Sequence, residues 1–310
     1  MSLSAVIASL ALAAQSPAQT PGLILSVDGS SGDVAATPAA PSTVLGRDTR
    51  GRPTLTARFN GQGPFAMVLD TGAQTSLVST GLADELDLPE LDGGLGVNGV
   101  SGAEQARLFA VDRFQTDLFD ADSVAVPALP NQGVTEARGI VGMEMLASGR
   151  LVFDQIAYRI RLEPSGGPHD GYAVIQGRLN DAGLLVVPVE IDGVKLDALV
   201  DTGAAISVVS GAAAQVLGWA EDDPRIKAAG VMRGAAGQGA AVQSAVVGHL
   251  AVGPVTFRDL NLFFSAQGGP STADSSPPTF ILGSDLLNNL EAFAVDFPKA
   301  QLLIRIPSRD

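Results

Sequence analysis

The chain has 310 residues, a formal net charge of −14 and no cysteine. The negative net charge argues against a nucleic-acid partner, because binding to nucleic acid would need a basic face. It also argues against binding to an anionic membrane surface, which would repel a negatively charged protein. Without cysteine, disulfide bonds, thiolate nucleophiles and cysteine-ligated zinc sites are excluded. With 36 glycines, 19 prolines and 5% aromatic residues, the composition indicates many short strands and turns, over a length that can bury two compact cores.

An apolar run at residues 3–14 comes first along the chain. It is too short to span a bilayer as an ordinary transmembrane helix, and small residues suited to cleavage follow it, so residues 1–19 are expected to be a signal peptide. Because no Lys or Arg precedes the run, a merely apolar N-terminus is the alternative. A signal peptide predicts export, to the periplasm or the exterior of a bacterium, and no membrane span is expected in the mature chain. Residues 20–50, rich in Ala, Pro, Ser and Gly, are expected to be a linker or a propeptide-like segment.

The first half of the remaining chain, residues 51–163, carries patterns typical of short strands. Residues 55–59 alternate and end at Asn60-Gly61, a strong hairpin-turn signal. Five glycines at residues 93–102 predict the tip of a hairpin that bends and approaches a ligand closely. The other expected elements are strands at 65–69, 108–119 and 124–129, a helix at 80–88 that stops before Pro89, a short helix at 143–146, and a closing hairpin at 151–154 and 158–162.

After an expected linker at residues 164–180, residues 181–310 repeat the same order of elements. The expected elements are strands at 184–191 and 196–200 joined by an Asp192-Gly193 turn, a short helix at 212–217, a glycine-rich hairpin at 230–239, an apolar strand at 280–282, a short helix at 285–290, and a closing hairpin at 294–297 and 302–306. A repeat of this length is a property of the whole fold rather than a solenoid period. The chain is therefore expected to be all-β with short helices and to consist of two similar halves.

One motif is nearly identical in the two halves. Between residues 70–79 and residues 201–210, seven of ten aligned residues are the same, and both stretches begin Asp-Thr-Gly-Ala. Each Asp follows an apolar run, which places it just past the end of an expected buried strand. Because an unpaired buried charge is costly, two carboxylates kept in matched settings are expected to work as a pair.

The residue types of this motif suit a shared carboxylate site. The Thr hydroxyl can bond across to a partner loop, and the Gly allows a tight turn and a close approach of another chain. Two carboxylates about 3 Å apart cannot both ionise comfortably, so they share one proton. The ionised member can then take a proton from a water while the protonated member polarises a carbonyl, and the water attacks without a covalent intermediate.

With these motifs the chain resembles the aspartic proteases, in particular the retropepsin-like branch found in bacteria, here with two lobes fused in one chain as in pepsin. The resemblance covers about residues 55–306. It rests on Asp-Thr-Gly-Ala at 70–73 and 201–204, and on the apolar-apolar-Gly segments at 140–142 and 281–283. It implies two similar closed-β lobes related by pseudo-twofold symmetry, and a monomer that needs no second chain.

The resemblance also implies roles for single residues. Asp70 and Asp201 would be the catalytic dyad of an aspartic endopeptidase that acts on protein or peptide substrates, with no cofactor and no metal. The dyad support would come from Thr71, Gly72, Thr202 and Gly203. Glycine-rich flaps would cover the substrate, with candidate flap residues Asn98, Gly99, Val100, Gly234 and Ala235. Pepsin-like motifs usually carry Ser or Thr after the Gly, so Ala73 and Ala204 predict a dyad that keeps its proton to higher pH.

Other interpretations of these residues stay open from the sequence. A non-catalytic peptide-binding protein on the same bilobal fold is the main alternative, and a glycosidase-type carboxylate pair is a weaker one. A metal site would need a third carboxylate or a His that is not reliably placed; the two histidines, His169 and His249, are expected in a loop and at a strand end. Among the other acidic residues, Glu144 and Asp285 are expected to be solvated, and Asp154 and Asp296 to be turn formers.

Overall fold

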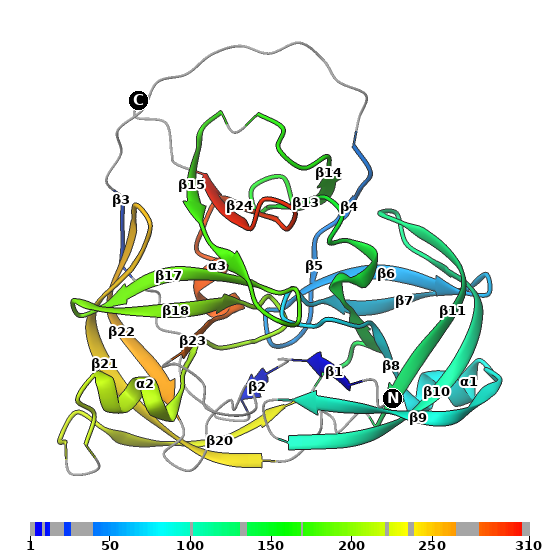
Figure 1. The fold of residues 1–310 in the computed structure, drawn as a ribbon, viewed down its shortest axis with the longest axis horizontal. Coiled ribbons are helices and arrows are strands. Elements are labelled where there is room, and N and C mark those ends of the chain that lie inside the picture. The colour runs from blue at the N-terminus through cyan, green and yellow to red at the C-terminus, as the bar shows by residue number, and fades with distance from the viewer. Residues whose placement is uncertain are drawn as a thin grey trace.

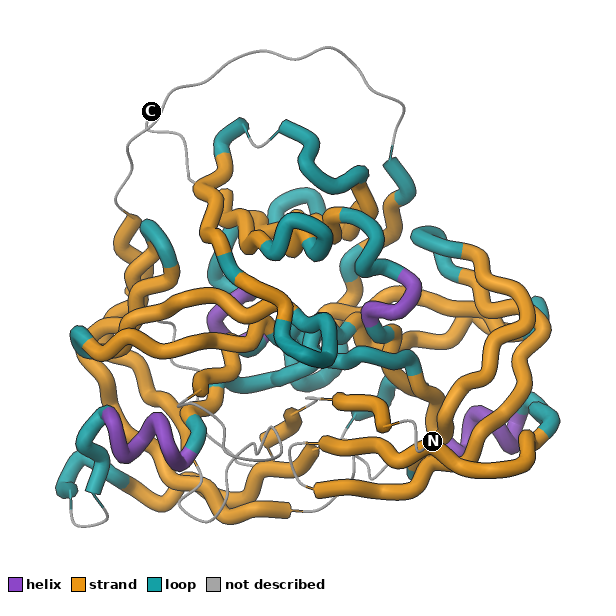
Figure 2. Tube along the Cα trace, viewed as in Figure 1, coloured by secondary structure: helices purple, strands orange, loops and turns teal. Residues whose placement is uncertain are grey.

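The computed structural model describes residues 4–7, 10–12, 22–25, 40–99, 102–130, 135–168, 170–220, 223–234, 239–264 and 279–305. Within these ranges the protein is mainly β, with only short helices, and two barrels lie side by side below a third sheet (Figures 1 and 2). In the described part of the chain, no helix is long and apolar enough to cross a membrane.

The N-terminal barrel is a closed sheet of six strands. Its order is β6-β7-β12-β8-β11-β10, and pairing of β6 with β10 closes it. Phe114 and Phe59 lie opposite each other at this closure, and their rings stack at 4.6 Å. The strands are β6 (Pro53–Phe59), β7 (Gln62–Leu69), β8 (Leu77–Ser79), β10 (Gly102–Gln115), β11 (Asp120–Leu129) and β12 (Gly139–Val141), joined by α1 (Thr80–Glu85) and followed by the short 3₁₀ helix η1 (Met143–Met145).

The C-terminal barrel has the same architecture. Its order is β17-β18-β23-β19-β22-β21, closed by pairing of β17 with β21. The strands are β17 (Leu185–Ile191), β18 (Val194–Val200), β19 (Val208–Val209), β21 (Gly239–Val252), β22 (Val255–Phe264) and β23 (Thr279–Leu282), with helices α2 (Gly211–Val216) and α3 (Ser284–Leu287). Two closed six-stranded barrels in the same order confirm the predicted fold class.

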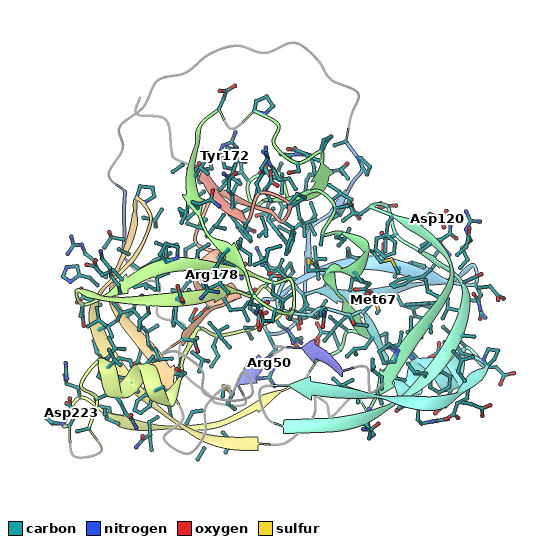
Figure 3. All side chains as sticks on the ribbon, viewed as in Figure 1. Arg50, Met67, Asp120, Tyr172, Arg178 and Asp223 are labelled. Carbon is teal, nitrogen blue, oxygen red and sulfur yellow. The ribbon has the colours of Figure 1, made fainter. Side chains whose placement is uncertain are left out.

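The first hairpin of each barrel shows why the sequence folds this way. β6 and β17 have the same alternation of buried and exposed residues, because successive side chains on a strand point to opposite faces. Asn60 and Gly61 both have positive φ, as do Asp192 and Gly193, which is the backbone of a two-residue hairpin turn. Both predicted turns are confirmed. Figure 3 shows a buried and an exposed side chain of the N-terminal barrel: Met67 lies inside it, and Asp120 is exposed on its outer edge.

A six-stranded sheet joins the two barrels, in the order β15-β25-β24-β13-β14-β4. Its central strands, β13 (Arg150–Asp154) and β24 (Ala292–Asp296), are equivalent strands of the two halves and pair antiparallel around Val152 and Ala294. One register position away, the Phe153 and Phe293 rings stack at 4.5 Å. The pseudo-twofold axis therefore passes through this sheet. Its outer strands are β14 (Arg159–Glu163), β25 (Gln301–Arg305), β4 (Ser42–Val44) and β15 (Tyr172–Gln176).

The segments expected to be linkers contain strands. β4 and the short β5 (Gly46–Arg47) lie within residues 20–50, and β15 and β16 (Arg178–Leu179) lie within residues 164–180. β4 and β15 are edge strands whose pairing partners are more than a hundred residues away, so local composition does not reveal them. Residues 20–50 also contain β3 (Gly22–Leu25). The segment expected to be a signal peptide, residues 1–19, contains β1 (Ser4–Ile7) and β2 (Leu10–Leu12).

The strand predicted at residues 108–119 is wrong at its end. β10 stops at Gln115, and the hydroxyl of Thr116 accepts hydrogen bonds from the backbone N–H groups of Leu118 and Phe119 at 3.0 and 3.1 Å. A short polar side chain that bonds its own backbone two or three residues on makes a turn. The apolar Leu118 and Phe119 therefore mark a turn rather than a continuing strand.

Asp154 and Asp296 end equivalent strands, and Asp296 has a second role. Asp154 accepts the Ala157 N–H at 2.8 Å and Asp296 accepts the Lys299 N–H at 3.3 Å, so both are turn formers as expected. Asp296 is fully buried, forms an ion pair with Arg150 at 3.1 Å and accepts the Ser165 hydroxyl at 2.6 Å. Burial acts to raise the pKa of Asp296, but the hydrogen bonds and the Arg150 charge outweigh it, and the pKa lies below its ordinary value. Asp296 thus anchors the segment that connects the two halves.

Candidate active site

The two Asp-Thr-Gly-Ala loops meet where the barrels face each other. Each loop follows a buried strand, β7 for Asp70 and β18 for Asp201, and both carboxylates are fully buried. Gly72 donates its N–H to Asp70 Oδ1 at 2.9 Å, and Ala204 donates its N–H to Asp201 Oδ1 at 2.9 Å. In both loops the N–H of the motif Ala also bonds the backbone carbonyl of the Asp at 3.3 Å, so equivalent turns orient the two carboxylates.

The Thr side chains lock the two loops together. The Thr71 hydroxyl donates to the carbonyl of Val200 at 2.8 Å and accepts the N–H of Thr202 at 3.0 Å. The Thr202 hydroxyl returns both bonds, donating to the Leu69 carbonyl at 2.6 Å and accepting the Thr71 N–H at 3.1 Å. Four buried hydrogen bonds thus fix the position of one half against the other.

The glycines of the motif let each carboxylate approach the opposite loop. A Cβ at Gly72 would lie 2.4 Å from Cγ of Asp201, and a Cβ at Gly203 would lie 2.1 Å from Cγ of Asp70. Real Cβ atoms do not come so close to other heavy atoms, so any other residue at either position would push the carboxylates apart. Gly72 and Gly203 are therefore required for the close approach rather than for a special φ.

The two carboxylates interact directly. Burial, the charge of Asp70 and a hydrogen bond with Asp70 raise the pKa of Asp201 well above its ordinary value, while the Ala204 and Gly203 N–H groups act in the opposite direction. Such a pair titrates as a unit and holds one proton over a wide pH range. The arrangement can therefore supply a proton donor and a proton acceptor at one place.

The apolar-apolar-Gly segments support the Asp loops from behind. The Asp70 N–H bonds the Val141 carbonyl at 3.0 Å, and the Asp201 N–H bonds the Leu282 carbonyl at 3.1 Å. A Cβ on Gly142 would lie 2.6 Å from backbone of the first loop, and one on Gly283 would lie 2.7 Å from backbone of the second. These glycines are thus needed for the close packing of two backbone segments.

Ser76 and Ser207 complete this support in both halves. Their hydroxyls accept the N–H groups of Gly142 and Gly283, each at 2.9 Å. Neither serine is among the predicted site residues. Their place was marked in the sequence, because Ser stands six residues after the Asp in both copies of the motif.

The expectation that Glu144 and Asp285 are solvated is confirmed for Glu144, which is exposed, and is wrong for Asp285, which is only partly exposed. Both carboxyls also have a structural role, because Glu144 accepts the Ser76 N–H at 2.8 Å and Asp285 accepts the Ser207 hydroxyl at 2.7 Å. Desolvation of the carboxyl groups raises the pKa of both, although these hydrogen bonds oppose it. Each acid stands two residues after the Gly of its half, a repeated position that a comparison of the halves could have identified as a support of the Asp loop.

One further support is present in the first half alone. Arg52 is buried, forms an ion pair with Asp48 at 2.7 Å and donates from Nη1 to the Gly203 carbonyl at 3.3 Å. In the second half, Asn180 holds the corresponding turn by accepting the Ala182 and Leu184 N–H groups. Leu184 stands there in the place of Arg52, so the repeat gave no signal for the Asp48–Arg52 pair.

The glycine-rich segments form a hairpin in each lobe. In the first, β9 (Glu90–Gly99) pairs with β10 so that Gly99 lies opposite Gly102. In the second, β20 (Lys227–Gly234) pairs with β21, and Arg233 lies opposite Gly239. Of the predicted flap residues, Asn98 and Gly99 end β9 and Gly234 ends β20, whereas Val100 and Ala235 lie outside the described residues.

The described residues contain no group of three or more His, Cys, Asp or Glu side chains that could hold a metal ion. His249 lies on β21 in the second barrel, where its N–H donates to Asp192 at 2.8 Å. His169 lies outside the described residues.

The comparisons with known proteins agree with this geometry. A comparison with curated proteins gives no match. The family profile described as aspartyl protease matches the chain twice, over residues 55–145 and 187–286. Each match contains one Asp-Thr-Gly-Ala loop and its apolar-apolar-Gly segment. Because the two matches together cover more than half of its residues, the chain belongs to the aspartyl protease family.

Proposed function

We propose that the protein is an aspartic endopeptidase that hydrolyses peptide bonds of protein substrates with Asp70 and Asp201. The observation that carries this proposal is the pairing of two fully buried carboxylates, each of which lies against the motif glycine of the opposite loop. Burial and the charge of Asp70 raise the pKa of Asp201 in this pair. A protein that only held peptides would not need a like-charge pair in a buried position, because such a pair costs stability. The Thr71–Thr202 lock spends four buried hydrogen bonds on keeping that pair together.

In the proposed mechanism Asp201 holds the shared proton and Asp70 is ionised. Asp70 takes a proton from a water while the water oxygen bonds the carbonyl carbon of the substrate, and Asp201 gives its proton to the carbonyl oxygen. The tetrahedral diol then loses a proton to Asp201 as the peptide nitrogen is protonated from Asp70 and the carbon–nitrogen bond breaks. A carboxylic acid and an amine leave, and the dyad again holds one proton.

The direct test is incubation of the full chain with a mixed peptide library at several pH values, with and without pepstatin. Pepstatin places a hydroxyl between paired Asp carboxylates, so pepstatin-sensitive cleavage is the expected result. The cleaved bonds would also reveal the preferred side chains around the scissile bond. Absence of cleavage at every pH would contradict the proposal, as would cleavage that pepstatin leaves unchanged.

We also propose that the protein acts as a monomer and is exported. Both carboxylates come from one chain and the lobes are joined by a sheet with strands from each half, so no second copy is required for the dyad. The apolar run at residues 3–14 supports export. Proteins outside the cytoplasm would then be its substrates.

The residue after each motif Gly should set the pH range of activity. Ala204 is fully buried beside Asp201. In the Ala204→Ser variant, the hydroxyl can donate to the ionised carboxylate, which lowers the pKa of the dyad. Because a hydrogen bond to a charged group contributes about 1.5–3 kcal/mol and about 1.4 kcal/mol equals one pKa unit, both limbs of the pH–rate profile should move about one to two units towards acid.

The pH–rate profile of kcat/KM measures this shift, with exposed Ala212→Ser as the matched control. In the unsubstituted chain the raised pKa of Asp201 keeps the singly protonated dyad to higher pH, so activity should extend closer to neutral than in pepsin. A profile confined to strongly acid pH, or one that Ala204→Ser does not move, would show that the hydroxyl is not what sets the range.

A further inference from the structure

A buried ion pair stands beside the second Asp loop. Arg52 and Asp48 are both buried, and Arg52 Nη2 lies 2.7 Å from Asp48 Oδ2. The Asp48 carboxylate also accepts the Arg52 N–H and the Thr135 hydroxyl, each at 2.8 Å. Taking two charges out of water costs free energy that their attraction does not always offset, so a buried ion pair is weak evidence for stability. A role in the chemistry of the neighbouring site would explain the pair better.

One peptide group separates Arg52 from the carboxylate of Asp201. Arg52 Nη1 donates to the Gly203 carbonyl at 3.3 Å, and the N–H of the next residue, Ala204, donates to Asp201 Oδ1 at 2.9 Å. The Gly203–Ala204 peptide bond is trans, so its C=O and N–H point in opposite directions. The guanidinium and the carboxylate therefore lie at the two ends of the same peptide dipole.

This arrangement favours a negative charge on Asp201. A cation at the carbonyl end polarises the peptide, and hydrogen bonds in a chain strengthen one another in a low-dielectric interior. The Ala204 N–H thereby becomes a stronger donor to the ionised carboxylate. Burial and the charge of Asp70 raise the pKa of Asp201, whereas the N–H groups of Ala204 and Gly203 lower it. Arg52 thus strengthens an interaction that helps Asp201 to release its proton.

The other charged groups around the two Asp loops are acidic, and they are arranged alike in the two halves. Asp70 and Asp201 face each other, while Glu144 and Asp285 lie behind their respective loops. Arg52 breaks this symmetry.

The second half has no equivalent of this arginine. Leu184 stands in the place of Arg52 there, and an aliphatic side chain cannot donate a hydrogen bond to the matching carbonyl of the first loop. The two carboxylates therefore have different surroundings although their loops have nearly the same sequence.

We infer that Arg52 is a positioning residue that acts through the Gly203–Ala204 peptide and makes Asp201 the acid that gives its proton to the substrate. This role rests on the proposed function, which supplies the proton transfer. When Asp201 gives its proton to the carbonyl oxygen, a negative charge forms on its carboxylate. A peptide dipole that is oriented towards this charge beforehand stabilises it without rearrangement. Asp70 is then the acceptor of the water proton.

Two variants that change the charge of the pair in opposite senses test this role. Asp48→Asn leaves the charge of Arg52 unbalanced and should lower the pKa of Asp201. Asp48→Asn with Arg52→Gln removes both charges and should raise it, each shift being at least about half a pKa unit. The pKa is read from the ¹³C carboxyl signal of Asp201 in the aspartate-labelled full chain with Asp70→Asn, where one carboxyl of the dyad titrates and no turnover is needed. A purely structural role predicts shifts of one sign or none.

Hydrolysis of a fluorogenic peptide, measured with both dyad carboxylates present, gives a second readout. In the chain without both charges of the pair, kcat should fall about tenfold, less than the roughly 10²–10³-fold lost with a direct donor. KM should stay within about twofold, because the effect is confined to the transition state. The alkaline limb of the kcat profile should move to higher pH in this chain and to lower pH in Asp48→Asn. Arg52→Lys, which keeps a positive charge, should retain more of kcat than Arg52→Gln.

The control is the exposed pair Arg178–Asp197, whose charged groups lie 2.6 Å apart at the surface of the second barrel. Asp197→Asn with Arg178→Gln should change neither the pKa of Asp201 nor kcat. If the chain without both charges of the buried pair does not fold, Arg52→Lys replaces it, and the pKa of Asp201 should then stay within about 0.3 unit of its original value.

PKa shifts of the same sign in the two charge variants, or no shift in folded chains, would overturn the inference. The same holds for a pKa of Asp201 that rises in Asp48→Asn, and for Arg52→Lys no more active than Arg52→Gln. Opposite pKa shifts without hydrolysis in any form would support the inference and contradict the catalytic proposal instead.

Discussion

Replacing either Asp70 or Asp201 by Asn should abolish peptide hydrolysis. Asn has the shape of Asp, so the fold is preserved, but it can neither accept the proton of the attacking water nor deliver one to the carbonyl oxygen. General acid–base catalysis by a positioned side chain contributes on the order of 10²–10⁴-fold. Because the two carboxylates act as one unit, each single variant should lose at least that factor in kcat, and the double variant should lose little more.

The matched control is Asp87→Asn. Asp87 is exposed and has a φ of 49°, a left-handed conformation that Asn adopts as readily as Asp. Single-turnover hydrolysis of one fluorogenic peptide, measured for the original chain, the two single variants, the double variant and the control, separates the chemical step from binding. Turnover by Asp70→Asn or Asp201→Asn within tenfold of the original chain would rule out the dyad mechanism. The Asp201→Asn variant should also lose less stability as the pH rises above about 4, the ordinary pKa of Asp. In the original chain the unfolded state releases the Asp201 proton there, whereas the folded state keeps it because the pKa of the buried Asp201 is raised.

The Thr71→Val and Thr202→Val variants should lower the free energy of unfolding by about 2–5 kcal/mol each. Valine has nearly the shape of threonine, but Thr71→Val leaves the Thr202 N–H and the Val200 carbonyl without their buried partners. A buried polar group without a partner costs about 1–3 kcal/mol. Since the two hydroxyls serve neighbouring backbone groups of the same interface, the double variant should lose less than the sum of the single losses.

Urea unfolding followed by fluorescence and circular dichroism measures these losses, with the m-value as a check that the transition is unchanged. Thr56→Val is the control, because Thr56 is exposed on β6, where a β-branched side chain is equally suitable. If Thr71→Val and Thr202→Val were as stable as this control, the hydroxyls would contribute nothing to the contact between the halves. Loss of activity with unchanged stability would then have to come from a local displacement of the carboxylates.

The duplication explains why so much of the site could be predicted from one sequence. Asp70 and Asp201, with the Thr and Gly that follow each, occur twice in the same order, so the second copy serves as an alignment for the first. The structure brings these two copies into contact. The hairpin turns were predicted from residue patterns that recur at the corresponding places, whereas the closed barrels were implied by the resemblance to the aspartic proteases.

The features that the sequence did not reveal depend on long-range contacts. β4 and β15 are short edge strands in Pro- and Gly-rich segments, and only their partners β14 and β25 make them strands. The Asp48–Arg52 pair is present in one half alone, so no repeat marks it. Glu144 and Asp285 were marked by a repeated position, but acidic residues at the start of short helices are usually exposed, and only the fold shows that they hold the serines behind the Asp loops.

The six-stranded sheet has a consequence for how such a protein can be produced. Its central strands, β13 and β24, come from different halves. The apolar residues on one face of these strands, among them Phe153 and Phe293, belong to a core that is continuous with both barrels, whereas Val152 and Ala294 on the other face belong to a separate small cluster. A half made alone would leave one edge of β13 or β24 without a partner, and an unpaired edge is a template for association with other chains. Separate halves would have to find each other before they aggregate. Fusion in one polypeptide removes that competition, because the complementary edge is always tethered nearby.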